Sequence, residues 1–185
     1  MTEISGRVNL QSLLDHTARR IIQTISPFSF ETETLVLFSK WGCDGSTGQQ
    51  QYKQLFTGEQ HSDSDIFLTS CVPLLLYEEQ EDDPDMRRVY WENFRPFSTK
   101  YCRPISIKMQ KESTYLINAE VSNVEEQIET LGRTELVINN QSIQIQHKLM
   151  LTMIDGKVCN AVVENKSSQV CYICGASPKE MNRID

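Results

Sequence analysis

The sequence predicts a mixed α/β fold, in the α+β sense of helices packed on a mixed sheet. Three observations lead to this prediction. Two stretches repeat apolar residues with the 3.6-residue period of a helix, and several short segments are rich in the apolar and β-branched residues that strands prefer. Helices and strands are interspersed along the chain instead of forming separate blocks. The 185 residues are enough for one domain with a substantial core.

The first predicted helix covers residues 9–25, and the second begins near Ser122. Asn9 is a suitable N-cap for the first helix, and Pro27 ends it. Ser122 and Glu125 match a capping box at the start of the second helix. The apolar stripe of each helix predicts a packing surface. The stripes consist of Leu10, Leu13, Leu14, Ala18, Ile21, Ile22 and Ile25 in the first helix and Val124, Ile128 and Leu131 in the second, which Gly132 ends.

The predicted strands differ in their patterns. Thr34–Phe38 is uninterruptedly apolar, as is typical of a strand covered on both faces. Pro73 indicates an edge strand or a bulge, because proline cannot donate a hydrogen bond to a neighbouring strand. The last segment alternates, so its apolar residues share one face and Asp155 is the next position on that row. The predicted strands are Thr34–Phe38, Ile66–Tyr77, Cys102–Met109, Thr134–Ile138 and Ile143–Asp155.

Charge and hydropathy restrict the possible classes of function. The net charge of −7 disfavours sequence-independent binding of nucleic-acid phosphates by this chain alone. A carboxylate-rich metal site would itself add negative charge, so the acidity does not exclude chemistry on nucleic acids. The acidic run at 78–85 predicts a solvated loop, and a more basic stretch follows it. No apolar run approaches the ~18 residues of a membrane helix, and the first residues lack a signal-peptide pattern, so we expect an intracellular protein. The basic residues are Arg87, Arg88, Arg95, Lys100 and Arg103.

Two aspartates are candidate ligands of a divalent cation. Asp44 follows the first predicted strand in a glycine-rich segment, and Asp155 ends the last strand beside Gly156. Two carboxylates from different strands suit Mg²⁺ or Mn²⁺, and a pair of such ions can cleave a phosphodiester. Aspartate beside glycine at the end of a strand is also a common turn former. The pattern by itself leaves both interpretations open.

Among the six cysteines, only Cys171 and Cys174 have the spacing of metal ligands. Without a secretory signal, reduced thiols are favoured over disulfides. A C-x-x-C pair is half of a tetrahedral zinc site, a redox pair or a coincidence, and its spacing favours zinc. The segment Ser177–Glu180 then predicts the start of a helix. The remaining cysteines are predicted to be small buried residues, namely Cys43, Cys71, Cys102 and Cys159.

The order and spacing of these motifs resemble the catalytic core of the large V(D)J recombinase subunit and of its relatives, the Transib-type DDE DNA transposases. The resemblance covers roughly residues 28–180. It implies an incomplete RNase H-like core over 28–169, an N-terminal helical segment at 1–27, and the start of a zinc-binding insertion at 170–185. The motifs that carry it are Trp41-Gly42-Cys43-Asp44-Gly45, Tyr101-Cys102-Arg103-Pro104-Ile105-Ser106-Ile107, Met153-Ile154-Asp155-Gly156-Lys157 and Val170-Cys171-Tyr172-Ile173-Cys174.

This resemblance implies roles for particular residues. Asp44 and Asp155 take the places of the first two acids of an Asp-Asp-Glu set that binds two Mg²⁺ or Mn²⁺ ions. Cys171 and Cys174 take the places of two Zn²⁺ ligands whose partners are two histidines. The resemblance further implies DNA as the partner, a homodimer for the full-length parent and a nuclear location.

The third acid and the two histidines have no counterpart before Asp185, so we expect the chain to stop in mid-domain. The leading hypothesis is a fragment or domesticated remnant of a Transib-like transposase, which cleaves and joins DNA in its parent form and is inactive alone. A rival hypothesis is a non-catalytic DNA-binding or interaction protein that keeps the fold and uses the segment Arg95–Arg103. A truncated gene model without a function of its own is the third alternative.

Overall fold

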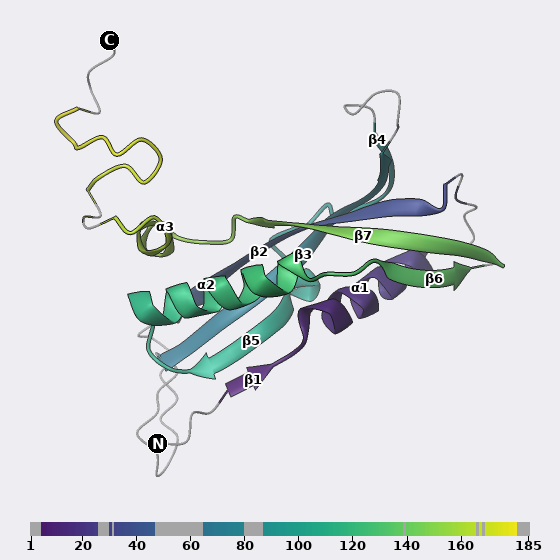
Figure 1. The fold of residues 1–185 in the computed structure, drawn as a ribbon, viewed down its shortest axis with the longest axis horizontal. Coiled ribbons are helices and arrows are strands. Elements are labelled where there is room, and N and C mark those ends of the chain that lie inside the picture. Colours follow the sequence, from purple (N-terminus) through teal and green to yellow (C-terminus); the bar gives the residue numbers. More distant parts are fainter. Residues whose placement is uncertain are drawn as a thin grey trace.

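The structure, a computed structural model, describes residues 5–25, 30, 32–46, 65–79, 87–138, 140–165, 167 and 169–180. Within them the chain forms one curled mixed sheet with three helices, so the predicted mixed α/β class is confirmed (Figure 1). The helices are α1 (Leu10–Ile25), α2 (Thr114–Glu129) and α3 (Gly156–Val162), and a 3₁₀ turn covers Thr99–Tyr101. The strands are β1 (Ser5–Arg7), β2 (Thr34–Gly45), β3 (Ile66–Glu79), β4 (Arg87–Glu92), β5 (Arg103–Met109), β6 (Thr134–Ile138) and β7 (Gln141–Leu151).

The order of strands in the sheet is β1-β5-β3-β2-β7-β6, and β4 pairs with β3. Strands β2 and β7 are parallel, in register from Thr34 opposite Gln144 to Trp41 opposite Leu151. The other pairings of described strands are antiparallel. Because parallel strands end at the same edge of a sheet, the C-terminal ends of β2 and β7 lie side by side.

Helices α1 and α2 cover one face of the sheet and share a core with β2 (Figure 1). In β2 the residues that face these helices are Leu35, Leu37, Trp41 and Cys43, all buried. The alternation of side chains along a strand places Lys40, Gly42 and Asp44 on the opposite face. This face is the one that carries the candidate site.

Pro73 lies at a β-bulge, where the pairing of β3 with β2 shifts between Phe38 and Ser39. The shift changes which residues of β3 face the helices: Phe67 and Cys71 before the bulge, and Leu76 after it. Because β3 has partners on both sides, the bulge alternative is confirmed and the edge alternative is wrong.

Several predicted boundaries are wrong. Helix α2 begins at Thr114 instead of near Ser122, because the side chain of Ser113 accepts a hydrogen bond from the amide of Leu116 at 3.2 Å and caps the helix there. Strand β2 continues to Gly45, and β7 stops at Leu151. Strands β1 and β4 and helix α3 were not predicted from the sequence, because each has seven residues or fewer.

Among the described residues, no helix is both long enough and apolar enough to cross a membrane. Most of the acidic run predicted as a loop, residues 80–85, lies outside the described residues. Its first two members, Glu78 and Glu79, belong to β3.

Candidate functional site

Asp44 is an exposed residue near the C-terminal end of β2, on the face opposite α1 and α2. Partial loss of hydration and, after it, the charge of Asp155 raise the pKa of Asp44 above its ordinary value. The charge of Glu112 acts in the same direction, whereas the Gly45 amide and the ammonium of Lys157 oppose it. The two aspartates singled out by the sequence therefore lie close enough for their charges to interact.

Asp155 is the N-cap of α3, and its Oδ1 accepts a hydrogen bond from the amide of Val158 at 2.8 Å. The prediction that Asp155 continues the apolar row of a strand is wrong, since β7 has ended four residues earlier, at Leu151. Asp155 instead has a local structural role as a helix cap, which differs from the turn at a strand end that the alternative predicted. This role does not exclude a second one, because the cap engages only one oxygen of an exposed carboxylate.

A close backbone approach brings the two aspartates together. The amides of Thr152 and Met153 both donate to the carbonyl of Trp41, at 3.0 Å. A Cβ atom on Gly42 would lie 1.9 Å from the carbonyl oxygen of Met153, so only glycine permits this contact. The chain that leaves β7 thus crosses over Gly42 and reaches Asp155 next to the end of β2.

Glu112 is a third acid at this site, and the sequence analysis did not identify it. It lies between β5 and α2 with its side chain 3% exposed, and its Oε2 is 2.8 Å from Nζ of Lys157. Gly45 provides the space, because a Cβ there would lie 2.7 Å from the Cβ of Glu112. The only sequence signal was an acid directly before the N-cap Ser113, which is too common to indicate a site.

The donor set at this site suits a hard divalent cation. The carboxylates of Asp44 and Asp155 come from two segments. Partial loss of hydration, and after it the charge of Asp155, raise the pKa of Asp44, and a cation would relieve the repulsion between the two charges. Glu112 is paired with Lys157, which supplies part of the compensating charge. In the described part of the chain, no three His, Cys, Asp or Glu side chains are grouped so as to hold a metal ion.

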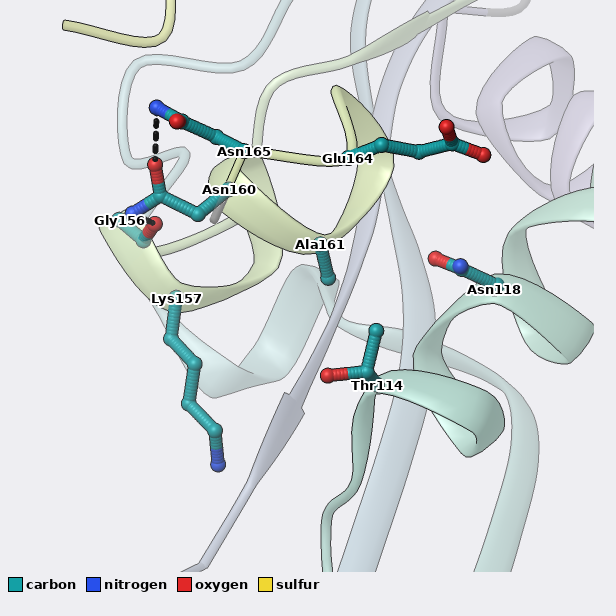
Figure 2. Close-up of a pocket in the computed structure, with 8 residues that line it drawn as sticks. All are labelled: Thr114, Asn118, Gly156, Lys157, Asn160, Ala161, Glu164 and Asn165. Carbon is teal, nitrogen blue, oxygen red and sulfur yellow. Dashed lines mark hydrogen bonds between the residues drawn. The ribbon is translucent and has the colours of Figure 1, made fainter. Parts of the chain in front are cut away.

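A cavity of about 610 Å³ lies beside the acids, between the first turns of α2 and helix α3 (Figure 2). Gly156 and Lys157, which directly follow Asp155, form part of its wall. Asn165 donates to Oδ1 of Asn160 at 3.1 Å across its rim. The residues that line the cavity are Thr114, Asn118, Gly156, Lys157, Asn160, Ala161, Glu164 and Asn165.

The C-x-x-C pair forms a tight turn. The Gly175 amide donates to the carbonyl of Cys171, and the Cys171 amide donates to that of Ala176, each at 2.9 Å. Hydrogen bonds from the amides of Cys174 and Ile173, and then from the Cys174 thiol, lower the pKa of Cys171. Backbone amides aimed at a sulfur favour the thiolate, the form that binds zinc.

The remaining cysteines divide into two kinds. Cys43 and Cys71 are buried as predicted, and burial raises the pKa of each thiol to about 12. Cys102 and Cys159 are only half-buried, so that prediction is wrong for them.

The predicted helix start at Ser177 appears as a turn. The amide and the hydroxyl of Ser177 donate to Oε2 of Glu180 at 2.8 Å and 2.7 Å. The contact of the Ser177 amide with the Glu180 carboxylate is one of the two that a capping box makes. The residues after Glu180 lie outside the described residues.

The fold and this site define a mixed α/β protein with a cluster of carboxylates where its one described parallel strand pair ends. Comparison with known proteins adds no relative: no protein-family model and no curated protein sequence matches this chain.

Proposed function

We propose that this chain carries two acids of a metal-dependent DNA-cleaving core, RNase H-like and of the Transib and V(D)J recombinase kind. The observation that supports this most is the convergence of Asp44, near the end of β2, with Asp155, in the segment that follows the parallel strand β7, where the charge of Asp155 acts on Asp44. The antiparallel set β2–β3–β5 is followed by helix α2 and then by β6 and β7, and the parallel pairing of β7 with β2 also supports it.

In this proposal Asp44 and Asp155 hold divalent cations, and Lys157 remains paired with Glu112 at the edge of the site. Bound cations supply an activated water and stabilise the leaving oxygen of a phosphodiester. The raised pKa of Asp44 means that the carboxylate takes up a proton, and loses its cation, at a higher pH than an ordinary aspartate does. With two of the three acids that the resemblance implies, we propose that these 185 residues turn over little or no DNA by themselves.

Mn²⁺ binding to the purified chain, followed by electron paramagnetic resonance, tests this proposal. Asp155→Asn is the sharpest variant, since asparagine caps a helix as well as aspartate does and only the charge is lost. We expect Asp44→Asn and Asp155→Asn each to weaken Mn²⁺ binding by at least about tenfold, because even outer-shell changes have effects of that size.

The control for this experiment is Glu126→Gln, which removes an exposed acid of α2. Equal Mn²⁺ binding by the wild type, both aspartate variants and the control would refute the metal site. Vigorous DNA cleavage by the wild type that Asp155→Asn abolishes would refute only the proposed inactivity.

We extend the proposal to Cys171 and Cys174 as two ligands of a zinc site. Two thiolates leave a tetrahedral site incomplete, so the purified chain should contain little tightly bound zinc. Stoichiometric zinc by elemental analysis would contradict this expectation.

A second candidate function is DNA binding without catalysis. Arg95 and Lys100 are exposed, whereas Nη1 of Arg103 donates to the backbone carbonyls of Lys100 and Cys102. Charge reversal of Arg95 and Lys100 therefore removes the cations without disturbing the loop that Arg103 supports. Loss of DNA binding in this double variant, with binding retained in Asp44→Ala, would favour this candidate.

A further inference from the structure

A groove of about 430 Å³ lies on the side of the sheet that carries Asp44. Its floor includes Lys40 of β2 and Val72 of β3, which are opposite each other in the sheet. Its walls come from the loop after β4, including Phe97, and from Thr152 and Met153, which precede Asp155. The volume is within the range of about 300–1,000 Å³ that small-molecule sites have.

The aromatic ring of Phe97 stands at the groove and is 92% exposed. The Nζ of Lys40 lies over this ring, 4.5 Å from its centroid. A cation held over one face of an exposed ring leaves the ring accessible for stacking. Burying such a ring against a flat apolar ligand would be favourable, since Phe97 now has little cover from the protein.

The surroundings of Phe97 are positively charged, although the chain as a whole has a net charge of −7. Residues 93–103 contain two arginines and one lysine but no acid, and Lys40 adds a fourth cation. Within the described chain, no ion pair engages Lys40, Arg95, Lys100 or Arg103. An exposed aromatic ring among cations matches the combination by which proteins hold single-stranded nucleic acid, with bases stacked and phosphates paired.

We propose that this groove binds an unpaired base of a DNA strand, stacked on Phe97, with the adjoining phosphates near Lys40 and Lys100. Lys40 and Asp44 share a face of β2 and are about 13 Å apart along the strand, a span of a few nucleotides. The same strand would thus continue over Met153 to the carboxylates. This continuation rests on the proposed function, whereas the stacking itself does not.

The experiment measures fluorescence anisotropy of a labelled single-stranded oligonucleotide with the full chain in EDTA. Phe97→Ala should lower the affinity between about fivefold and about a hundredfold, the range for one base stacked on an aromatic ring. Phe97→Trp should restore it. Phe94→Ala is the matched control, since Phe94 is 84% exposed in the same loop but does not line the groove.

Equal losses of oligonucleotide affinity in Phe97→Ala and Phe94→Ala would overturn the proposal. Equally tight binding of a blunt duplex and of the single strand would also overturn it, as would the absence of oligonucleotide binding by the wild type. Thermal melting of each variant checks that it folds, as we expect for substitutions at exposed positions. Because EDTA removes divalent cations, this measurement of stacking does not depend on the proposed metal site. Loss of affinity in Phe97→Ala without Mn²⁺ binding would therefore support the stacking proposal and refute the metal site. Mn²⁺ binding without loss of affinity in Phe97→Ala would support the metal site and refute the stacking proposal.

Discussion

At the scale of single residues, the site brings three carboxylates of like charge close together. Asp44, Glu112 and Asp155 come from three separate segments, and partial loss of hydration, followed by the charges of Asp155 and Glu112, raises the pKa of Asp44. The ion pair between Glu112 and Lys157 offsets only part of this repulsion. Functional sites often retain such unfavourable electrostatics because a ligand relieves it.

Asp44→Asn should stabilise the metal-free protein at neutral pH. The pKa of Asp44 is higher in the folded protein than in the unfolded chain. Such a carboxyl destabilises the folded state where it is ionised and has no such effect where it is protonated in both states. The gain in the free energy of unfolding should therefore appear above the folded pKa of Asp44 and vanish below about pH 4. We expect less than about 1 kcal/mol, because the exposed site is screened by solvent.

Thermal melts of the wild type and Asp44→Asn across this pH range measure the difference. Lower stability of the variant at neutral pH in EDTA would show that Asp44 is not repelled by its neighbours.

At the scale of elements, the contact between β2 and the chain leaving β7 decides where Asp155 lies. The parallel pairing ends at Trp41 and Leu151, and Met153 then packs its backbone on Gly42. Because the obstructing atoms belong to the backbone, no change of side-chain rotamer makes room for a methyl group. The position of Asp155 thus depends on a glycine two residues before Asp44.

Gly42→Ala should lower the free energy of unfolding by about 1–3 kcal/mol and weaken Mn²⁺ binding, since the Met153–Asp155 segment must move away from β2. Urea unfolding and the Mn²⁺ assay measure the two effects. Gly156→Ala is the control, because a Cβ at Gly156 would meet nothing within 4 Å. Wild-type values for both quantities in Gly42→Ala would refute the proposed constraint.

At the scale of the whole molecule, buried Glu120 of α2 connects the helix to the far end of the sheet. Its carboxylate accepts from Ser106 at 2.7 Å, is 2.7 Å from Nζ of Lys108, and pairs with Arg7 of β1. Burial would raise the pKa of Glu120, but the hydrogen bonds of Lys108 and Ser106 and the charge of Arg7 outweigh it and lower the pKa. No local sequence pattern indicated this cluster.

Glu120→Gln should lower the free energy of unfolding by about 3 kcal/mol, the lower end for breaking a buried ion pair, because Arg7 is partly exposed. A lowered carboxyl pKa stabilises the fold above the unfolded pKa, and this contribution is lost as the pH falls through the folded pKa. The difference between variant and wild type in urea should therefore shrink in acid. A pH-independent difference, or one no larger than that of exposed Glu126→Gln, would contradict this account.

Prediction from sequence succeeded where one local signal dominated. Helix α1 has a long apolar stripe and the N-cap Asn9, whose side chain accepts from Ser12 as expected. Prediction of the start of α2 failed because two local signals competed, since Ser122 and Ser113 are both acceptable N-caps. The burial of Leu116 and Ile117 against the sheet selects the earlier start for α2. Such a choice depends on tertiary packing, which outweighs local propensity.

The sequence by itself determined the mixed α/β class, most of the long elements, and the choice of Asp44 and Asp155 as residues to examine. Only the tertiary structure decided that β2 and β7 are parallel neighbours, that Glu112 joins the two aspartates, and that Phe97 borders a groove on the same face. The physical reason is that periodicity and capping act over a few residues. Strand pairing and the meeting of charges connect residues far apart in the chain, and these contacts depend on how the whole sheet packs.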